Sequence, residues 1–170
     1  MALGIDQDGI PGTITPTPDG FEIVLERGVD HDIQHVWANL TEPDRFAQWL
    51  APGSLELRQG GAVRLDFGES GATIDSTVRA LEAERVLEYS WSSGDEPLRP
   101  LRWELVPDDS WTTVRLTLAL PKGEDPAKAA AGWDAHLEML LAALEGVAIS
   151  FPFERFKAAR AHFQEMVNSA

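Results

Sequence analysis

Apolar positions follow a period of two through the first part of the chain and a helical period after about residue 121. In the first part, apolar residues alternate with polar ones in short runs, which is typical of half-buried strands. Turn signals such as Gly60-Gly61 and Pro107–Ser110 separate the runs. The predicted strands cover residues 21–27, 55–57, 63–67, 72–81, 85–91, 101–105 and 113–120.

The helical spacing predicts a long helix from about Pro126 to Glu145. Gly146 is expected to end it, because glycine is favoured just past a helix C-terminus. One broad apolar stripe on this helix contains Trp133, Leu137, Leu140, Leu141 and Leu144.

A last amphipathic helix is predicted after Pro152. Its apolar positions are Phe153, Phe156, Phe163 and Val167. Packing against its own domain is the default for such a helix, and a homodimer contact is the alternative.

Residues 36–50 predict two short helices joined by a tight turn. Asp30 or Asp32 can cap the first helix, and Thr41 is expected to cap the second by accepting from the amide of Asp44. Pro43 suits the first turn of that second helix. The segment then forms an apolar corner from Trp37, Leu40, Phe46, Trp49 and Leu50.

A series of strands followed by a long helix predicts an α+β domain, with the helix laid across one face of an antiparallel sheet. The 170 residues are enough for one domain with a sizeable core. Residues 1–18 are rich in Gly, Pro, Thr and Asp without a period, so we expect a flexible arm there.

Charge and composition exclude several classes of function. The net charge of −14 repels nucleic acid and anionic membranes, so we expect neither as a partner. The absence of cysteine excludes disulfides and thiol catalysis. Neither a secretory signal nor a span of about 20 apolar residues is found, which predicts a cytoplasmic protein.

Three histidines are the most reactive candidates. His31 and His35 have the i, i+4 spacing of metal ligands, but they lie at the polar start of a helix and fit surface residues better. His136 lies about 60° from the centre of the long helix's apolar stripe, which places it at a rim. We identify no catalytic motif and expect no cofactor and no metal.

Four stretches closely resemble proteins similar to the activator of Hsp90 ATPase, of the START/Bet v 1-like (SRPBCC) superfamily. These stretches are Val36–Leu50, Gly60-Gly61, Arg102–Leu105 and Gly132–Gly146. The resemblance covers roughly residues 20–146. It implies a helix-grip fold, in which a curved sheet of about seven strands wraps the long helix. The expected division is an arm over 1–18, a domain over 19–148 and a helical extension over 149–170.

In the fold that the chain resembles, the space between sheet and helix often holds a small ligand, and the two short helices help to close it. Inward-facing aromatic side chains can line such a cavity or simply fill a core. The residues expected to line it are Trp37, Trp49, Phe67, Tyr89, Trp91, Trp103, Trp133, Leu137 and Leu141.

Three functions remain open from the sequence. The leading hypothesis is binding of a small hydrophobic or amphipathic molecule in this cavity. The first alternative is an enzyme of the cyclase or dehydratase type, for which Ser76, Tyr89 and His136 are the only polar candidates. The second alternative, suggested by the family resemblance, is a chaperone-associated interaction protein.

Overall fold

The computed structural model describes residues 12–68, 71 and 73–169. Its strands are β1 (Thr13–Thr17), β2 (Gly20–Val29), β3 (Gly53–Leu55), β4 (Ala62–Asp66), β5 (Thr73–Glu82), β6 (Val86–Ser90), β7 (Pro100–Asp108) and β8 (Trp111–Pro121). Its helices are α1 (Ile33–Thr41), α2 (Pro43–Phe46), α3 (Pro126–Leu144) and α4 (Phe153–Asn168).

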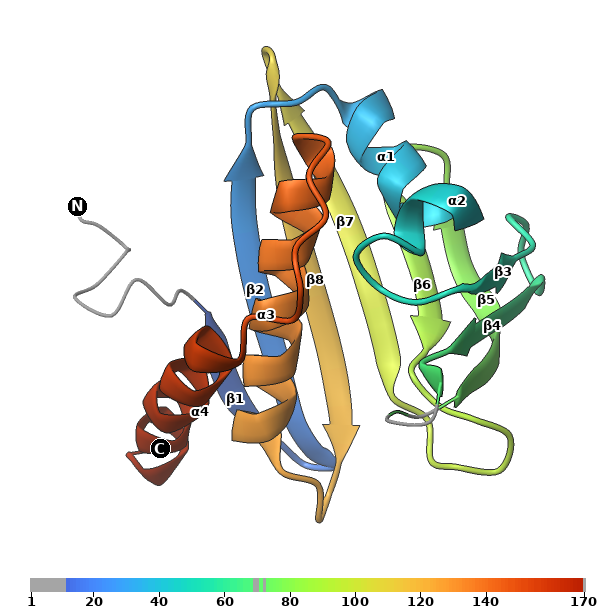
Figure 1. Ribbon diagram of the computed structural model, residues 1–170. Coiled ribbons are helices and arrows are strands. Elements are labelled where there is room, and N and C mark those ends of the chain that lie inside the picture. Colours follow the sequence, from blue (N-terminus) through green and yellow to red (C-terminus); the bar gives the residue numbers. More distant parts are fainter. Residues whose placement is uncertain (1–11, 69–70, 72, 170) are drawn as a thin grey trace.

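The described strands form one antiparallel eight-stranded sheet in the order β1-β2-β8-β7-β6-β5-β4-β3. Helix α3 crosses one face of this curved sheet, α1 and α2 lie over one end, and α4 lies beside α3 next to β1 (Figure 1). This is the predicted helix-grip architecture, in which a sheet and a helix bury their apolar faces against each other.

The two central strands show why the alternating pattern predicted the sheet correctly. Leu101, Trp103 and Leu105 of β7 are all buried, and Trp103 pairs with Leu116 on β8. The residues between them, such as Arg102, face the other side of the sheet and remain partly exposed. A period of two therefore places one row of each strand in the core.

The N-terminal prediction was wrong over residues 13–17. Strand β1 pairs with β2 along its whole length, and Ile14 is buried opposite Ile23. Pro16 is tolerated because an edge strand can lack an inward amide donor. Since this strand has one buried apolar residue, its burial pattern does not alternate. It raises the expected seven strands to eight, and residues 1–11 of the predicted arm lie outside the described residues.

Two smaller predictions were also wrong. Thr41 does not cap the second helix, because it is the last residue of α1 and donates its hydroxyl hydrogen to Trp37 O at 2.8 Å. Glu42 takes the cap position of α2 without a side-chain bond, while Pro43 begins the helix as predicted. The run at 55–57 ends early, since β3 stops at Leu55 and the side chain of Leu57 is exposed.

The long helix has the predicted ends. Asp125 accepts hydrogen bonds from the amides of Ala127 and Lys128, and Pro126 occupies the first turn. Gly146 follows the helix with φ of 81°, a conformation that glycine adopts without strain. The opening helix is also capped as predicted, by Asp32 accepting from the amide of His35 at 2.9 Å.

Helix α4 packs along α3 and β1, with Ala159 and Phe163 fully buried. Phe153 at its start is 65% exposed. The homodimer contact through this helix stays a prediction, and Phe153 is the side chain that it would cover. The division of the chain at residues 18 and 148 and the cytoplasmic location stay predictions as well. No helix in the described part of the chain is long and apolar enough to cross a membrane.

Candidate functional site

A cavity of about 580 Å³ lies between the sheet and the first half of α3. It is at the end of the interface away from α1 and α2, where the β8–α3 connection turns (Figure 1). Its volume is typical of a small-molecule site. The apolar wall includes Phe67, Ile74, Trp91, Leu118, Leu120 and Trp133.

Aromatic rings form the rigid part of this wall. Trp91 and Trp133 meet edge to face, with centroids 4.7 Å apart and planes at 72°. Phe67 packs edge-on against Trp91 at 5.7 Å. Such contacts hold each ring in one orientation, so the wall has a defined shape before any ligand enters.

Small residues on α3 leave the cavity open. Ala129 and Gly132 line it from the helix, and a Cβ built on Gly132 meets no heavy atom within 4 Å apart from its own helix backbone and chain neighbours. Glycine inside a helix costs about 1 kcal/mol relative to alanine. The helix therefore has empty space at a position where a larger side chain would have closed the gap.

His136 lies one turn further along the same face of α3 and also lines the cavity. Its Nδ1 is 3.1 Å from Trp49 O, and its ring packs against Phe67, Trp133 and Phe151 at centroid distances of 6.0, 5.7 and 5.6 Å. Burial lowers the pKa of His136, and the bond with Trp49 O only partly offsets this. The imidazole is therefore neutral at pH 7.

Charged side chains surround the mouth of the cavity. Arg99 donates to both carboxylate oxygens of Glu124 at 2.8 Å, and it also contacts Glu96 at 3.3 Å. These bonds raise the pKa of Arg99, so it stays charged but is neutralised locally. Lys128 is exposed at the same mouth and forms no ion pair with another described residue.

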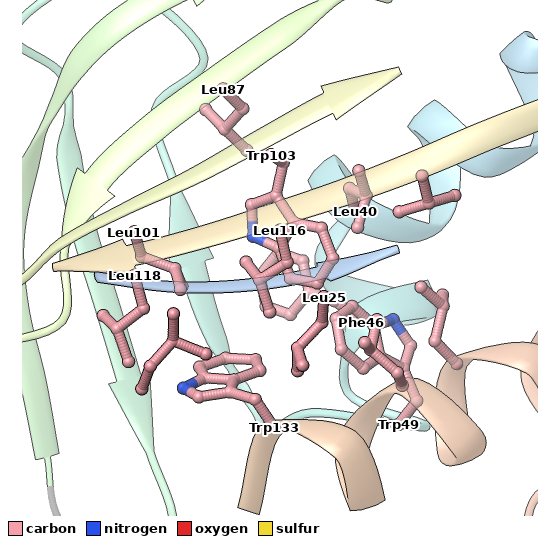
Figure 2. Close-up of a cluster of buried hydrophobic side chains, with 14 of the residues drawn as sticks. Leu25, Leu40, Phe46, Trp49, Leu87, Leu101, Trp103, Leu116, Leu118 and Trp133 are labelled. Atoms are coloured by element: carbon pink, nitrogen blue, oxygen red, sulfur yellow. The ribbon is translucent and has the colours of Figure 1, made fainter. Parts of the chain in front are cut away.

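The other end of the helix–sheet interface is filled. Phe46, Trp49 and Trp103 are at most 2% exposed, and Figure 2 shows them packed with Leu25 and Leu116 between α2, the sheet and α3. Trp49 donates its indole hydrogen to Asn39 O at 2.8 Å. The space left beside Tyr89 there is only about 10 Å³. The apolar corner of residues 36–50 is therefore part of the core. It is linked to the cavity by the carbonyl oxygen of Trp49, which contacts His136.

A charged cluster fixes the opposite face of α3. Asp134 is fully buried, and it accepts from Arg27 of β2 at 2.5 Å and from Arg155 of α4 at 2.6 Å. Glu138, one turn on, lies 3.5 Å from Arg27. The cluster joins α3 to both the sheet and α4, so the distance between the helix and the sheet is fixed.

Three of the nine residues expected to line a cavity do so, namely Phe67, Trp91 and Trp133. Four others are buried in the packed region: Trp37, Trp49, Trp103 and Leu137. Tyr89 borders only the small void, and Leu141 is half-buried on α3 away from the cavity. For all nine, a role in binding a ligand stays a prediction.

Sequence reasoning assigned His136 to a rim and did not single out Gly132, Arg99 or Lys128. The spacing of residues along α3 could have placed both His136 and Gly132 at the cavity. Ala129, Gly132, Trp133 and His136 follow the i, i+3, i+4, i+7 spacing of a single helix face. A glycine on such a face marks a place where the helix does not fill its surroundings.

The other polar candidates lie elsewhere. Ser76 donates to Ser90 O at 2.7 Å, and Tyr89 is buried, which raises the pKa of its hydroxyl. His31 Nε2 lies 2.5 Å from Glu145 Oε2, and His35 Nε2 bonds Leu144 O at 2.9 Å. The two histidines are partly exposed, as expected for surface residues, and they join the start of α1 to the end of α3. The described residues contain no cluster of three side chains placed to hold a metal ion.

A curved sheet that grips a long helix beside a cavity defines a protein of the START/Bet v 1-like class. Residues 30–145 match the family model described as Activator of Hsp90 ATPase homolog 1-like protein, and the chain belongs to this family. Among curated proteins, no sequence match was found.

Solved structures share the fold. CalU16 from Micromonospora echinospora is 20% identical with a TM-score of 0.76, over 92% of this chain and 95% of CalU16. EF2215 from Enterococcus faecalis, a conserved protein of unknown function, is 20% identical with a TM-score of 0.79, over 97% and 95%. DynU16, from the dynemicin biosynthetic locus, is 28% identical with a TM-score of 0.67, over 75% of this chain and 48% of DynU16. Family and fold fit a ligand-binding or cyclase-like role.

Proposed function

We propose that this protein binds a small apolar or amphipathic molecule in the cavity between the sheet and the first half of α3. The observation behind the proposal is the 580 Å³ cavity, which has aromatic walls and a charged mouth. A largely preformed apolar pocket with a few polar groups is the usual form of a small-molecule site. The likeness to DynU16, which comes from a biosynthetic locus, is in line with a small organic ligand.

The energetics of such a site are sufficient without covalent chemistry. Burying about 300 Å² of apolar ligand surface supplies roughly 7 kcal/mol before the costs of association. The rigid rings of Trp91 and Trp133 lose little freedom when a ligand binds, because they already pack against each other. Because 7 kcal/mol corresponds to a Kd of about 10 μM before those costs are subtracted, a Kd between about 10 μM and 1 mM is expected.

Binding is favoured over a cyclase or dehydratase reaction because the polar candidates are separated. Of Ser76, Tyr89 and His136, only His136 lines the cavity. An enzyme that polarises a carbonyl needs at least two polar groups converging on the reacting atoms. The charged groups of the mouth, Arg99 and Glu124, are bonded to each other instead.

Native mass spectrometry of freshly purified protein would reveal a retained ligand directly. Equilibrium dialysis with 2-methoxynaphthalene, a flat apolar probe, then measures the capacity of the cavity. Gly132→Leu places four carbon atoms in the empty space on α3 and should weaken probe binding without unfolding the protein. Ala158→Leu adds a similar side chain on the exposed side of α4 and serves as the control.

We expect the wild type and Ala158→Leu to bind the probe with a Kd between about 10 μM and 1 mM, and Gly132→Leu to lose at least about tenfold in affinity. If the wild type retains no molecule and binds no probe, the proposal is wrong. If Gly132→Leu binds as the wild type does, the probe lies outside this cavity, and the assignment of the site is wrong.

A further inference from the structure

His136 is held in one orientation at the wall of the cavity. Its Nδ1 contacts Trp49 O, and three aromatic rings surround the imidazole. Rotation of the ring would break the hydrogen bond and disturb the packing with Phe67 and Trp133. The direction of the second nitrogen, Nε2, is thereby set before a ligand arrives.

The hydrogen bond also determines the tautomer. A carbonyl oxygen can only accept, so the hydrogen of the neutral imidazole is on Nδ1. Nε2 then has a lone pair and acts as an acceptor. The lowered pKa of His136, caused by burial, is consistent with this neutral form at pH 7.

Nε2 has no hydrogen-bond partner among the residues that the structure describes, whereas Nδ1 does. Within the same residues, no fully buried polar side-chain atom lacks a partner. Nε2 is therefore not sealed in the protein, and the space that His136 borders is the cavity. A hydrogen-bond acceptor thus lies beside the aromatic part of the cavity wall, next to Phe67 and Trp133.

We propose that His136 determines the specificity of the cavity by accepting a hydrogen bond at Nε2 from a hydroxyl group on a flat aromatic ligand, as in phenols and naphthols. This inference rests on the proposed binding function and adds the class of ligand. The aromatic walls select the flat body, and the lone pair selects the donor.

The other polar groups do not offer an equivalent acceptor inside the cavity. The carboxylates of Glu124 and Glu96 lie at the mouth and already accept from Arg99. The third lining carboxylate, Asp125, caps α3 by accepting from two backbone amides, and its other oxygen accepts from Arg160. A hydroxyl that leaves water for an apolar wall without a new partner pays a desolvation penalty, and only His136 Nε2 removes that penalty there. A methyl ether with the same ring system has no donor and leaves Nε2 unpaired.

Two probes with the same ring system test this directly. 2-Naphthol has the hydroxyl donor, whereas 2-methoxynaphthalene has none. Equilibrium dialysis at pH 7.5 should show about fivefold tighter binding of 2-naphthol to the wild type, the worth of one hydrogen bond. ¹⁵N spectra of the histidine ring should show an unprotonated Nε2 in the free protein and a shift of that nitrogen when 2-naphthol binds.

Two variants separate the acceptor from the packing. His136→Asn keeps an amide donor for Trp49 O but has no atom at the position of Nε2, and His136→Phe keeps a ring without any nitrogen. In both, the ratio of the two affinities should fall to about one.

Each outcome decides one question. If neither probe binds the wild type, the proposed binding function fails. If both probes bind the wild type equally, or if either variant keeps the fivefold preference, the cavity binds aromatic molecules but the role of His136 is wrong.

Discussion

Both ends of the helix–sheet interface are rich in tryptophan, but one end is filled by side chains and the other contains a cavity. Around Trp49 and Trp103 the interface is filled, and the void of about 10 Å³ nearby lies between Phe46 and Tyr89. Around Trp91 and Trp133 the same interface opens into a cavity of about 580 Å³. Trp133 contacts both regions, since its ring lies 6.0 Å from Trp103 and 4.7 Å from Trp91.

The difference lies in what covers the sheet. At the filled end, α1 and α2 add Trp37, Leu40 and Phe46 to the side chains of α3. At the open end, α3 itself presents Ala129 and Gly132. An abundance of aromatic residues therefore does not distinguish a core from a cavity. The open end differs in having Ala129 and Gly132 on α3 and no α1 or α2 over the sheet.

The largest expected effect comes from truncating one tryptophan at each end. Trp103→Ala should lower the free energy of unfolding by about 3–5 kcal/mol, because it leaves a void in a filled core. Trp91→Ala should lower it by about 1–2 kcal/mol, because that side chain is partly exposed and borders the cavity. Urea unfolding of both variants gives the two values. Equal losses would mean that the two ends are packed alike.

The charged face of α3 offers a second test, since it holds the helix above the cavity. Asp134→Asn should destabilise the protein by about 3 kcal/mol, because it leaves the nearly buried Arg27 without a full countercharge. The double variant Arg27→Met with Asp134→Leu removes both charges and should recover most of that loss. Denaturant midpoints measure both. A wild-type midpoint for Asp134→Asn would show that the cluster does not hold the helix.

Gly132→Ala should stabilise the protein by about 0.5–1 kcal/mol, because alanine favours the helix and the added methyl group meets open space. Ala131→Gly, one residue earlier and fully buried, is the matched opposite and should cost about 1 kcal/mol or more. Thermal unfolding compares the two. Destabilisation by Gly132→Ala would contradict an open space at this position.

The smallest expected effect is a dependence of stability on pH at the open end. Because burial lowers the pKa of His136 in the folded protein, the unfolded chain binds a proton first as the pH falls through about 6.5. Stability that is present above this pH is therefore lost on acidification.

His136→Phe should remove this part of the pH dependence. Urea midpoints at pH 7.5 and 5.5 measure it, and the other titrating groups cancel when the variant is compared with the wild type. The same change in both proteins would mean that His136 does not titrate in this range with a lowered pKa.

Local patterns predicted most of the fold correctly. The alternation around Trp103 and Leu116, the cap at Asp32 and the ends of α3 all depend on residues close together in the chain. β1 was missed because one buried residue, Ile14, makes no pattern, and the strand exists only through its pairing with β2. The Thr41 hydroxyl could cap the following helix or donate to a carbonyl of its own helix, and in the structure it donates to Trp37 O of α1.

The amino-acid sequence by itself determined most of the secondary structure, the inward rows of the sheet and the family, because these follow from local spacing and short motifs. Tertiary structure alone decided which tryptophans border empty space and where Nε2 of His136 lies. The volume of the cavity is the space between the sheet and α3 minus the volume of the side chains that occupy it. The distance between α3 and the sheet sets this volume. That distance depends on contacts between residues as distant in the chain as Arg27 and Asp134.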